Sequence, residues 1–599
     1  MKAYLNGQEY AFEEGETILQ LARRAGVFIP TLCRFEPLSH KPATCRVCLV
    51  EVSDGAGTRM VASCETPLAD GMRIDTLSRH VRDMQRTQVE MIFADHDQEC
   101  VSCARHGDCE LQDLGEAVGL TRNRFTHRLR PTAAERPLDD SAAGMTRDMS
   151  KCIRCLRCVE VCRQIQGVAA LTVDGQGLGT CIGVGMADDH SASACIQCGQ
   201  CTLVCPTGAL AERDQNDLVL DMLADPKITT VFSFAPSVRV LLGEEFGFAP
   251  GVNVEGKIVG ALRRIGADVV LDTDFAADVT IMEEGTELLG RLKKGAKGPM
   301  FTSCCPGWIN YAEKHCPGVL PHISSTRSPQ AILGALAKSY LPEAMGLEKG
   351  RLRTVSIMPC VAKKDEAARP ELAREDVPDT DVVLTVREFA RLLRRMGVDL
   401  ADVEPEPFDN PFMSASTGAA VIFGSTGGVM EAAVRTVYAV VTGKELEHIE
   451  VTPLRGMDGV REAVIDLGEG NGSIRVAICH GLRNARALAE QAMAGESPYD
   501  FIEVMACPGG CVDGGGTSRV KGDYHPHART RQQGLYSLDR AMPRRQSHKN
   551  PQVKKLYEDF LGEPNSHKAH ELLHTAYSDR SESPSETIFA NKQRLTLTD

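Results

Sequence analysis

The sequence predicts an α+β multidomain protein, in which small cysteine-rich modules precede a large α/β domain. Three observations predict this fold class. The chain has 599 residues, enough for roughly three to five domains of about 100–200 residues each. Most of its 23 cysteines stand in short, regularly spaced groups before residue 210. From about residue 226, apolar runs of strand length alternate with helical patterns, which is typical of an α/β domain.

The composition indicates an ordinary soluble protein, with 43% hydrophobic and 25% charged residues. A net charge of −14 argues against nucleic acid as the main partner, because phosphate contacts need clustered Lys and Arg. No apolar run is long enough to cross a bilayer, and the start of the chain does not resemble a signal peptide. Disulfide frameworks belong to small secreted domains. We therefore expect a cytoplasmic protein whose thiols bind metal.

Residues 1–77 predict a β-grasp, ferredoxin-like module. Asn6-Gly7 lies between two alternating runs and is a strong hairpin signal. A helical pattern follows over residues 16–30, with Gly26 and Pro30 as stop signals. The next loop begins the first cysteine group, whose spacing suits a 2Fe–2S cluster, although zinc also accepts four thiolates. This first group is Cys33, Cys45, Cys48 and Cys64.

Residues 78–118 are predicted to be helical around a second, shorter cysteine group. Its three cysteines would leave a 4Fe–4S cluster one ligand short, and histidine can replace cysteine on iron. The alternative is that the histidine is only a surface or capping residue. The second group is His96, Cys100, Cys103 and Cys109. The polar residues 119–147 suit a connector.

Residues 148–215 contain two C-x₂-C-x₂-C-x₃-C runs. In this bacterial ferredoxin arrangement, the fourth cysteine of each run binds the cluster of the other run. The first run lacks the trailing proline and has Arg163 instead. The third group is therefore Cys152, Cys155, Cys158 and Cys205, and the fourth group is Cys195, Cys198, Cys201 and Cys162. Each is expected to hold a 4Fe–4S cluster.

Residues 225–525 predict the large α/β domain, followed by a helical extension over 526–585 and a tail over 586–599. Strands are expected over 229–235, 268–271, 354–358, 475–480 and 500–506, and helices over 257–267, 483–495 and, in the extension, 553–562. Several of the strands run directly into a motif loop. Sites gather where the strands of such domains end.

Three motifs carry the chemistry of this domain: TSCCPGW at 302–308, MPCVAKKDE at 358–366 and EVMACPGGCVDGGG at 503–516. Gly509 and Gly510 permit a close backbone approach to a cluster. Because the motifs are far apart in sequence, they must converge in the folded domain. They supply five thiols where a 4Fe–4S cluster needs four: Cys304, Cys305, Cys360, Cys507 and Cys511.

On these motifs the chain resembles the iron-only (FeFe) hydrogenases, nearly from end to end. The resemblance implies that Cys305, Cys360, Cys507 and Cys511 hold the 4Fe–4S part of an H-cluster. Cys511 would bridge to a di-iron subsite with CO, cyanide and azadithiolate ligands. Cys304 would be a free thiol that passes protons. The N-terminal modules match the larger clostridial-type enzymes and the catalytic subunit of NADP-reducing hydrogenase complexes.

The resemblance extends to residues around the di-iron subsite. Pro236, Ser237, Gln330, Met358, Lys363 and Met505 match positions that pack against or hydrogen-bond its ligands, and Phe423 is a looser match. Lys363 could donate to a cyanide, whereas Lys364 reads as a solvated lysine. A proton relay from Cys304 would use Glu284, Ser324, Glu287 and Arg291. Alternatively, Glu287 and Arg291 form a helix-stabilising i,i+4 pair.

The resemblance implies reversible conversion of hydrogen into two protons and two electrons. The implied cofactors are one 2Fe–2S cluster, three accessory 4Fe–4S clusters and the H-cluster, with maturation proteins to install the di-iron unit. No G-x-G-x-x-G joins a strand to a helix. Electrons are therefore expected to pass to or from ferredoxin or separate NAD(P)-linked flavin and iron–sulfur subunits. The remaining cysteines, Cys181, Cys316 and Cys479, are read as core or incidental thiols.

Three other functions compete with this hypothesis. A hydrogen sensor is expected to lose the proton-delivering thiol or to carry a signalling module. A non-catalytic relative in cluster assembly would lack the complete di-iron pocket. A purely electron-carrying subunit of a respiratory complex would fit the first 210 residues but not the three later motifs.

Overall fold

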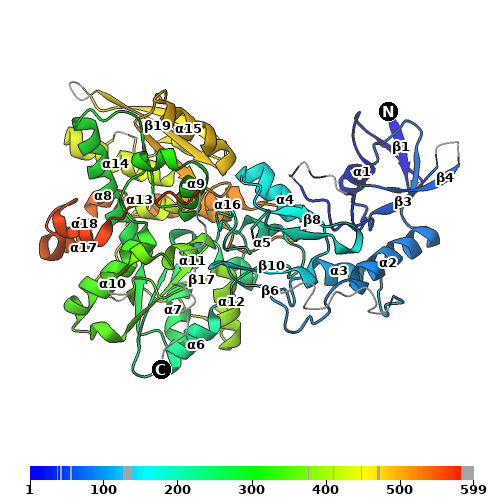
Figure 1. Cartoon of the computed structure of the whole chain (residues 1–599), viewed down its shortest axis with the longest axis horizontal. Coiled ribbons are helices and arrows are strands. Elements are labelled where there is room, and N and C mark those ends of the chain that lie inside the picture. The colour runs from blue at the N-terminus through cyan, green and yellow to red at the C-terminus, as the bar shows by residue number, and fades with distance from the viewer. Residues whose placement is uncertain are drawn as a thin grey trace.

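The modules follow one another along the long axis of the molecule (Figure 1). The N-terminal module lies at one end, the module with the two long cysteine runs in the middle, and the large α/β domain at the other end. The structure, a computed structural model, describes all residues except 37, 39, 41–42, 54–56, 126–137, 188, 375–376, 409, 447, 469–471 and 582–599. Within these described residues, no helix is long and apolar enough to cross a membrane.

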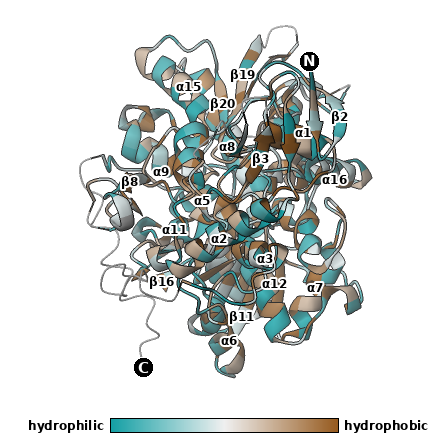
Figure 2. Cartoon of the chain, turned by 90° about the vertical axis from the view of Figure 1, so that its right-hand side faces the viewer, coloured by the Kyte–Doolittle hydropathy of each residue, from teal (hydrophilic) through white to brown (hydrophobic). Residues whose placement is uncertain are grey.

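The N-terminal module is a mixed five-stranded sheet, in the order β2-β1-β5-β3-β4, with helix α1 packed on it. The predicted hairpin is confirmed: Leu5 pairs with Gln8, and Asn6 and Gly7 have φ of 50° and 85°. Seen from this end, apolar positions are concentrated at α1 (Figure 2). The elements are β1 Lys2–Leu5, β2 Gln8–Ala11, α1 Ile18–Arg24, β3 Leu49–Ser53, β4 Thr58–Ala62 and β5 Arg73–Asp75.

The region predicted as helical around the second group contains two helices, α2 Arg79–Ala94 and α3 Glu110–Ala117. Ser78 is the N-cap of helix α2, and its side chain accepts a hydrogen bond from the Val81 amide. His96, Cys100 and Cys103 lie in the loop between the helices, and Cys109 is the residue directly before α3.

The middle module contains the paired helices α4 Arg157–Val161 and α5 Gln200–Val204, each with cysteines of both long runs around it. One boundary of the sequence prediction is wrong. Strand β7 pairs with β10, with Leu210 opposite Arg147, so the last residues assigned to the connector belong to this module. Residues 126–137 of the connector lie outside the described residues. The other elements are β6 Leu138–Asp139, β7 Met145–Asp148, β8 Thr172–Asp174, β9 Cys181–Gly183, β10 Leu210–Glu212 and α6 Asn216–Ala224.

The large domain contains two four-stranded sheets, ordered β12-β11-β14-β17 and β13-β20-β19-β18. The first sheet is parallel throughout, and in the second only β18 is antiparallel to its neighbour. The five expected strands correspond to β11, β12, β14, β19 and β20. The strands are β11 Thr229–Phe234, β12 Val269–Asp272, β13 Met300–Phe301, β14 Leu352–Met358, β17 Val382–Thr385, β18 Val460–Asp466, β19 Ser473–His480 and β20 Phe501–Met505; the short β15 Ala373–Arg374 and β16 Val377–Pro378 pair separately.

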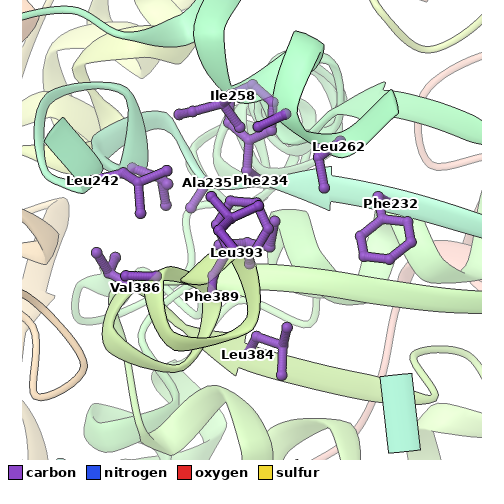
Figure 3. Packing of buried hydrophobic residues seen from close by; sticks show 14 of the residues in the cluster. Phe232, Phe234, Ala235, Leu242, Ile258, Leu262, Leu384, Val386, Phe389 and Leu393 are labelled. Carbon is purple, nitrogen blue, oxygen red and sulfur yellow. The ribbon is translucent and has the colours of Figure 1, made fainter. Parts of the chain in front are cut away.

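Helices cover these sheets, and buried aliphatic and aromatic side chains fill the space between the helices and the sheets. Phe232 and Phe234 of β11 pack with Phe389 and Leu393 of α12 and with Ile258 of α7 (Figure 3). Such burial stabilises the domain by roughly 1.5–3 kcal/mol per large apolar side chain. The helices are α7 Glu255–Arg264, α8 Thr273–Lys293, α9 Pro306–His315, α10 Pro329–Met345, α11 Ala362–Ala367, α12 Val386–Arg395, α13 Gly418–Val421, α14 Gly428–Thr442 and α15 Leu482–Ala494.

The C-terminal extension packs back onto the large domain. Its helices are α16 Ala528–Ala541, α17 Pro551–Leu556 and α18 His567–Leu573. The helix expected over 553–562 corresponds to α17 and the π-helical turn Tyr557–Leu561. Arg327 donates its backbone N–H to the carbonyl of Leu573, which ties the extension to the start of α10. The predicted tail, 586–599, lies outside the described residues.

Candidate active site

Loops from four parallel strands converge on one cavity. Pro236 and Ser237 follow β11, Cys304 and Cys305 follow β13, and Cys360 follows β14. The loop after β20 contributes Cys507 and Cys511. The cavity has a volume of about 80 Å³, and all five thiols of the three motifs line it. The three distant motifs therefore meet at the carboxyl edges of both sheets.

Cys304 and Cys507 are buried, and the other three thiols of the cavity are half-buried. Burial, together with the neighbouring Cys305, raises the pKa of Cys360 to about 12. The Ala506 amide donates to the sulfur of Cys305 at 3.3 Å. Free thiolates would be costly in this place, whereas iron binds thiolates directly. The donor set and its position around a cavity therefore fit an iron–sulfur group.

Glycines allow the motif loops to approach so closely. Gly510 has φ of +94°, and a Cβ there would lie 2.5 Å from the backbone nitrogen of Thr426. A Cβ at Gly514 would collide with the carbonyl oxygen of Pro359. The C-P-G-G-C-V-D-G segment therefore needs glycine at these positions for both conformation and space.

The seven residues predicted around the di-iron subsite all line this cavity: Pro236, Ser237, Gln330, Met358, Lys363, Phe423 and Met505. Sequence reasoning missed Thr273, which lines it from the start of α8. Within the part of the chain that the structure describes, Ser237 Oγ, Thr273 Oγ1 and Gln330 Oε1 are buried without a hydrogen-bond partner. Buried polar atoms are usually satisfied, so these three fit a polar ligand in the cavity.

The two lysines of the KKDE stretch are both buried. Lys363 Nζ pairs with Glu366 Oε2 at 2.8 Å and donates to the carbonyl of Cys304 at 3.2 Å. The expectation that Lys364 is solvated is wrong. It is 3% exposed and pairs with Glu388 at 2.9 Å, because α11 is enclosed between β17 and α9.

Glu284 lies near Cys304. It is fully buried in α8, and this burial raises its pKa to about 8, with a further contribution from the negative charge of Glu287. Burial and the nearby Glu284 raise the pKa of Cys304. Ser324 Oγ donates to Glu287 Oε2 at 2.8 Å. Cys304, Glu284 and Glu287 are therefore neighbours, and a hydrogen bond joins Glu287 to Ser324. Within the part of the chain that the structure describes, both carboxyl oxygens of Glu284 are buried without a hydrogen-bond partner.

Arg291 is positioned differently from the other relay candidates. Its Nη1 donates to the carbonyl of Pro321 at 3.4 Å, and among the described residues it forms no ion pair with Glu287. A branch that sequence reasoning missed begins at Glu287 instead. Ser325 Oγ donates to Glu287 at 3.4 Å and is hydrogen-bonded to His574 Nδ1 at 2.9 Å. His574 belongs to the C-terminal extension, and no sequence spacing connects it to Glu287.

The first group of cysteines is arranged as two pairs. The sulfurs of Cys33 and Cys45 are 3.3 Å apart, and the side chains of Cys48 and Cys64 are hydrogen-bonded to each other. One pair for each iron suits a 2Fe–2S cluster better than a single zinc ion, which needs all four thiolates around one centre. Within the described ranges, no three Cys, His, Asp or Glu side chains are placed to hold a single metal ion.

The second group lies next to the first and third. His96 is 6% exposed and meets the Phe93 ring edge-on at 6.4 Å. Cys33 and Cys45 of the first group, Cys109 of the second and Cys155 of the third belong to one buried cluster. Three of the cysteine groups therefore share one part of the core.

The structure places the last cysteine of each long run near the cysteines of the other run. A separate small cavity is lined by the whole third group, Cys152, Cys155, Cys158 and Cys205. Cys162 of the first run lies close enough to Cys195 and Cys201 to raise their pKa values, although burial is the larger cause.

The fourth group adjoins the large cavity. A Cβ on Gly515 would collide with the carbonyl oxygen of Cys198, and one on Gly307 would lie 3.8 Å from Cys198 Cβ. Glycines thus let the fourth group and the catalytic loops come into direct backbone contact. The cysteine groups form a continuous series from the N-terminal module to the cavity.

Family models match five consecutive parts of the chain. Residues 228–515 match "Iron only hydrogenase large subunit, C-terminal domain", and 526–580 match "Iron hydrogenase small subunit". Residues 1–79 match a 2Fe–2S iron–sulfur cluster binding domain. Residues 85–124 match an NADH-ubiquinone oxidoreductase-G iron–sulfur binding region, and 151–209 match a 4Fe–4S dicluster domain.

Individual proteins resemble almost the whole chain. The NADP-reducing hydrogenase subunit HndD of Solidesulfovibrio fructosivorans is 44% identical over 96% of this chain and 98% of its own length. Iron hydrogenase 1 of Clostridium pasteurianum is 37% identical over 96% and 99%. A solved structure of FeFe-hydrogenase HydA1 from Chlamydomonas reinhardtii has 40% identity and a TM-score of 0.55, and covers 61% of this chain and 99% of that chain. With its N-terminal iron–sulfur domains and its hydrogenase catalytic domain, the chain belongs to the iron-only hydrogenases, oxidoreductases that act on hydrogen.

Proposed function

We propose that this hydrogenase catalyses the reversible reaction H₂ ⇌ 2 H⁺ + 2 e⁻ at the cavity between its two sheets. One observation carries the proposal: five thiols converge there, one more than a 4Fe–4S cluster needs, and Cys304 lies beside the buried Glu284. A hydrogen sensor has no need for a proton path of this kind. A cluster-binding relative without turnover has no need for it either.

Cys305, Cys360, Cys507 and Cys511 would hold the 4Fe–4S part of the H-cluster, with Cys511 bridging to the di-iron unit. When bound, that unit supplies the open iron at which hydrogen is made or split. The protein holds and orients the unit. Ser237, Thr273 and Gln330 offer polar atoms to its ligands, and Lys363 offers an ammonium beside the Cys304 carbonyl.

Protons would move between Cys304 and the surface through Glu284, Ser324 and Glu287. With a pKa of about 8, Glu284 can take up and release a proton near neutral pH. We place Arg291 outside this proton path, because it donates to Pro321. From Glu287, Ser325 and His574 form a second hydrogen-bonded branch, which continues to the buried Glu283.

Electrons would travel singly through one 2Fe–2S cluster and three accessory 4Fe–4S clusters, held by the four cysteine groups. The order of entry is first or second group, then third, fourth and the H-cluster, because the third group shares a core with the first two and the fourth adjoins the catalytic loops. For the second group, His96 would supply the ligand that the three cysteines lack.

NAD(P)-linked flavin and iron–sulfur subunits are the proposed electron partners. The likeness to an NADP-reducing hydrogenase subunit over 98% of that protein supports them. Ferredoxin is the other proposed partner, since no nucleotide-binding fingerprint lies in this chain. We propose a cytoplasmic location, where maturation proteins would load the di-iron unit.

Infrared spectroscopy combined with a thiol variant tests the proposal. Matured wild-type protein should show metal-bound CO and cyanide bands. Cys304→Ser should keep these bands but lose hydrogen turnover by about 10²–10⁴-fold, the usual effect of removing a proton-transfer group. Cys316→Ser, a half-buried thiol outside the cavity, is the matched control and should keep full turnover. Matured wild-type protein without these bands, or full turnover in Cys304→Ser, would contradict the proposal.

A further inference from the structure

We propose that the buried ion pair between Arg157 and Glu110 makes the third-group cluster easier to reduce than the second-group cluster and so directs electrons inward. The proposal rests on the cluster ligands proposed above. The step is a one-electron transfer from the reduced second-group cluster to the oxidised third-group cluster, without any proton transfer or bond change.

The pair lies between ligands of the two clusters. Glu110 directly follows Cys109 of the second group, and Arg157 directly precedes Cys158 of the third group. The contact is bidentate: Nη1 is 3.0 Å from Oε1, and Nη2 is 3.0 Å from Oε2. Arg157 is 1% exposed, and its guanidinium lies 4.5 Å from the centre of the Phe35 ring. The carboxylate is thus carried next to a second-group ligand and the guanidinium next to a third-group ligand, although the Glu110 amide also donates to the carbonyl of Pro206, which follows Cys205.

One further guanidinium group increases the positive charge on the inner side. Arg519 donates to the carbonyls of Leu203 and Cys205, and Arg157 also donates to the carbonyl of Val204, at 3.4 Å. Both arginines thus lie at the end of α5, the helix that leads to Cys205. Arg105 reaches the carbonyl of Thr202 from the second-group loop, where its amide donates to Cys103 Sγ, so its charge acts on both groups. Arg519 is partly balanced by Asp108, 3.0 Å away, and Asp108 again lies beside Cys109.

Electrostatics gives the direction of the effect. Reduction makes a cluster more negative, so a nearby guanidinium stabilises the reduced state and raises the reduction potential. A carboxylate beside a ligand has the opposite effect on its own cluster. Because both charges are buried, neither water nor salt screens them strongly. The pair therefore widens the potential difference between the two clusters in the direction of the active site.

A role in stability alone does not account for this arrangement. Burying two charges costs several kcal/mol per ion, and well-packed apolar residues often serve stability equally well. The pair is placed with each charge one residue away from a cluster ligand. The two roles also differ in what they predict, because stability depends on the contact and a reduction potential depends on the charge.

The test is a redox titration followed by electron paramagnetic resonance, on the full-length chain with its accessory clusters but without the di-iron unit. Arg157→Gln should lower the potential of the third-group cluster. Glu110→Gln should raise the potential of the second-group cluster. Arg157→Lys keeps the charge but loses the bidentate contact, so both potentials should stay near their wild-type values. Melting temperatures measured in parallel report the structural effect of each change.

The charge hypothesis fails if Arg157→Gln and Arg157→Lys leave the third-group potential equally unchanged or shift it by the same amount. If Arg157→Gln does not fold, Arg519→Gln replaces it, and it should also lower the third-group potential. Cys158→Ser tests the ligand assignment separately, since it should remove or alter the third-group signal. An unaltered signal in that variant would contradict the proposed function and not the role of the ion pair.

Discussion

At the residue scale, the raised pKa of Glu284 is the property that bears most directly on proton transfer. A carboxyl group in an apolar helix face resists ionisation, so its pKa rises from 4.5 to about 8. Two more buried carboxyl groups in this domain, Glu503 and Asp278, are each raised to about 7, mainly by burial. Glu503 accepts the amides of Gly427 and Met430, and Asp278 accepts hydrogen bonds from Thr417 and Asn550. Glu284 differs because it lies next to Cys304.

Replacement of Glu284 by glutamine should affect both catalysis and the pH dependence of stability. Hydrogen turnover should fall by about 10²–10⁴-fold, because an amide cannot relay the proton. Between pH 4.5 and 8, wild-type Glu284 is protonated when folded and ionised when unfolded. The free energy of unfolding contributed by this group therefore decreases as pH rises, by at most about 1.4 kcal/mol per pH unit. The measurement is denaturant unfolding of the apoprotein at several pH values.

Relative to wild type, Glu284→Gln should become more stable as pH rises from 5 to 8. Glu287→Gln is the control, because Glu287 is only half-buried and donors surround it. It should impair turnover without reproducing this pH-dependent gain. Parallel stability curves for wild type and Glu284→Gln would show that Glu284 is ionised in the folded protein.

The sequence predicts residues that belong to a local motif, but it does not predict residues whose partners come from distant elements. Cysteine spacing predicts candidate ligand sets for the four N-terminal groups, whereas the resemblance to the family supplied the set for the catalytic domain. The environment of Lys364 depends on Glu388, which lies in another helix. Thr273 lines the cavity because β12 ends there, and His574 reaches Glu287 because the extension packs back. Such tertiary contacts leave no local signal.

At the element scale, strand ends and glycines determine the geometry of the site. Apolar runs identified β11, β12, β14, β19 and β20, since buried parallel strands are almost continuously hydrophobic. The two-residue strand β13, which positions Cys304 and Cys305, is too short for such a pattern. The pairing of β7 with β10 was also missed, because β7 is polar and half-buried.

Replacement of Gly515 by alanine should disturb the contact between the fourth group and the catalytic loops. The new methyl group would collide with the backbone of Cys198 and Gly199, and neither can move like a side chain. Overpacking of this kind costs about 1–3 kcal/mol. The variant should unfold at lower denaturant concentration and bind less iron at the fourth group, as measured by iron content and cluster spectra.

Gly290→Ala provides the control for this experiment. Gly290 lies in α8 and has no atom within 4 Å of its Cβ position. Alanine there should raise the free energy of unfolding by about 0.5–1 kcal/mol, because it restricts the unfolded chain and favours the helix. An unchanged stability and a full iron content in Gly515→Ala would mean that the two backbones are less tightly apposed than the structure shows.

At the scale of the whole molecule, buried ion pairs and close backbone contacts join the middle module to the large domain. Glu212 of β10 pairs with Arg387 at 2.7 Å and with Arg391 at 2.8 Å. Val361, next to Cys360, would clash with a Cβ on either Gly144 or Gly199. The N-terminal modules also contact the middle module: Glu110 pairs with Arg157, and His40 is hydrogen-bonded to the carbonyl of Cys155.

A chain that begins at residue 138 should therefore keep catalysis with a small electron donor. It retains the third and fourth groups and every contact between β10 and the large domain. Arg157 would lose Glu110, but it would then lie at a new surface, where water can solvate it. After maturation, the shortened chain should evolve hydrogen from reduced methyl viologen at close to the full-length rate, but without the signals of the first and second groups. A chain that begins at residue 226 is the comparison; it should be less stable, because Val361 loses the cover that Gly144 and Gly199 provide. If the chain from residue 138 fails to fold or to turn over, the N-terminal modules support the catalytic domain and are more than an electron entry.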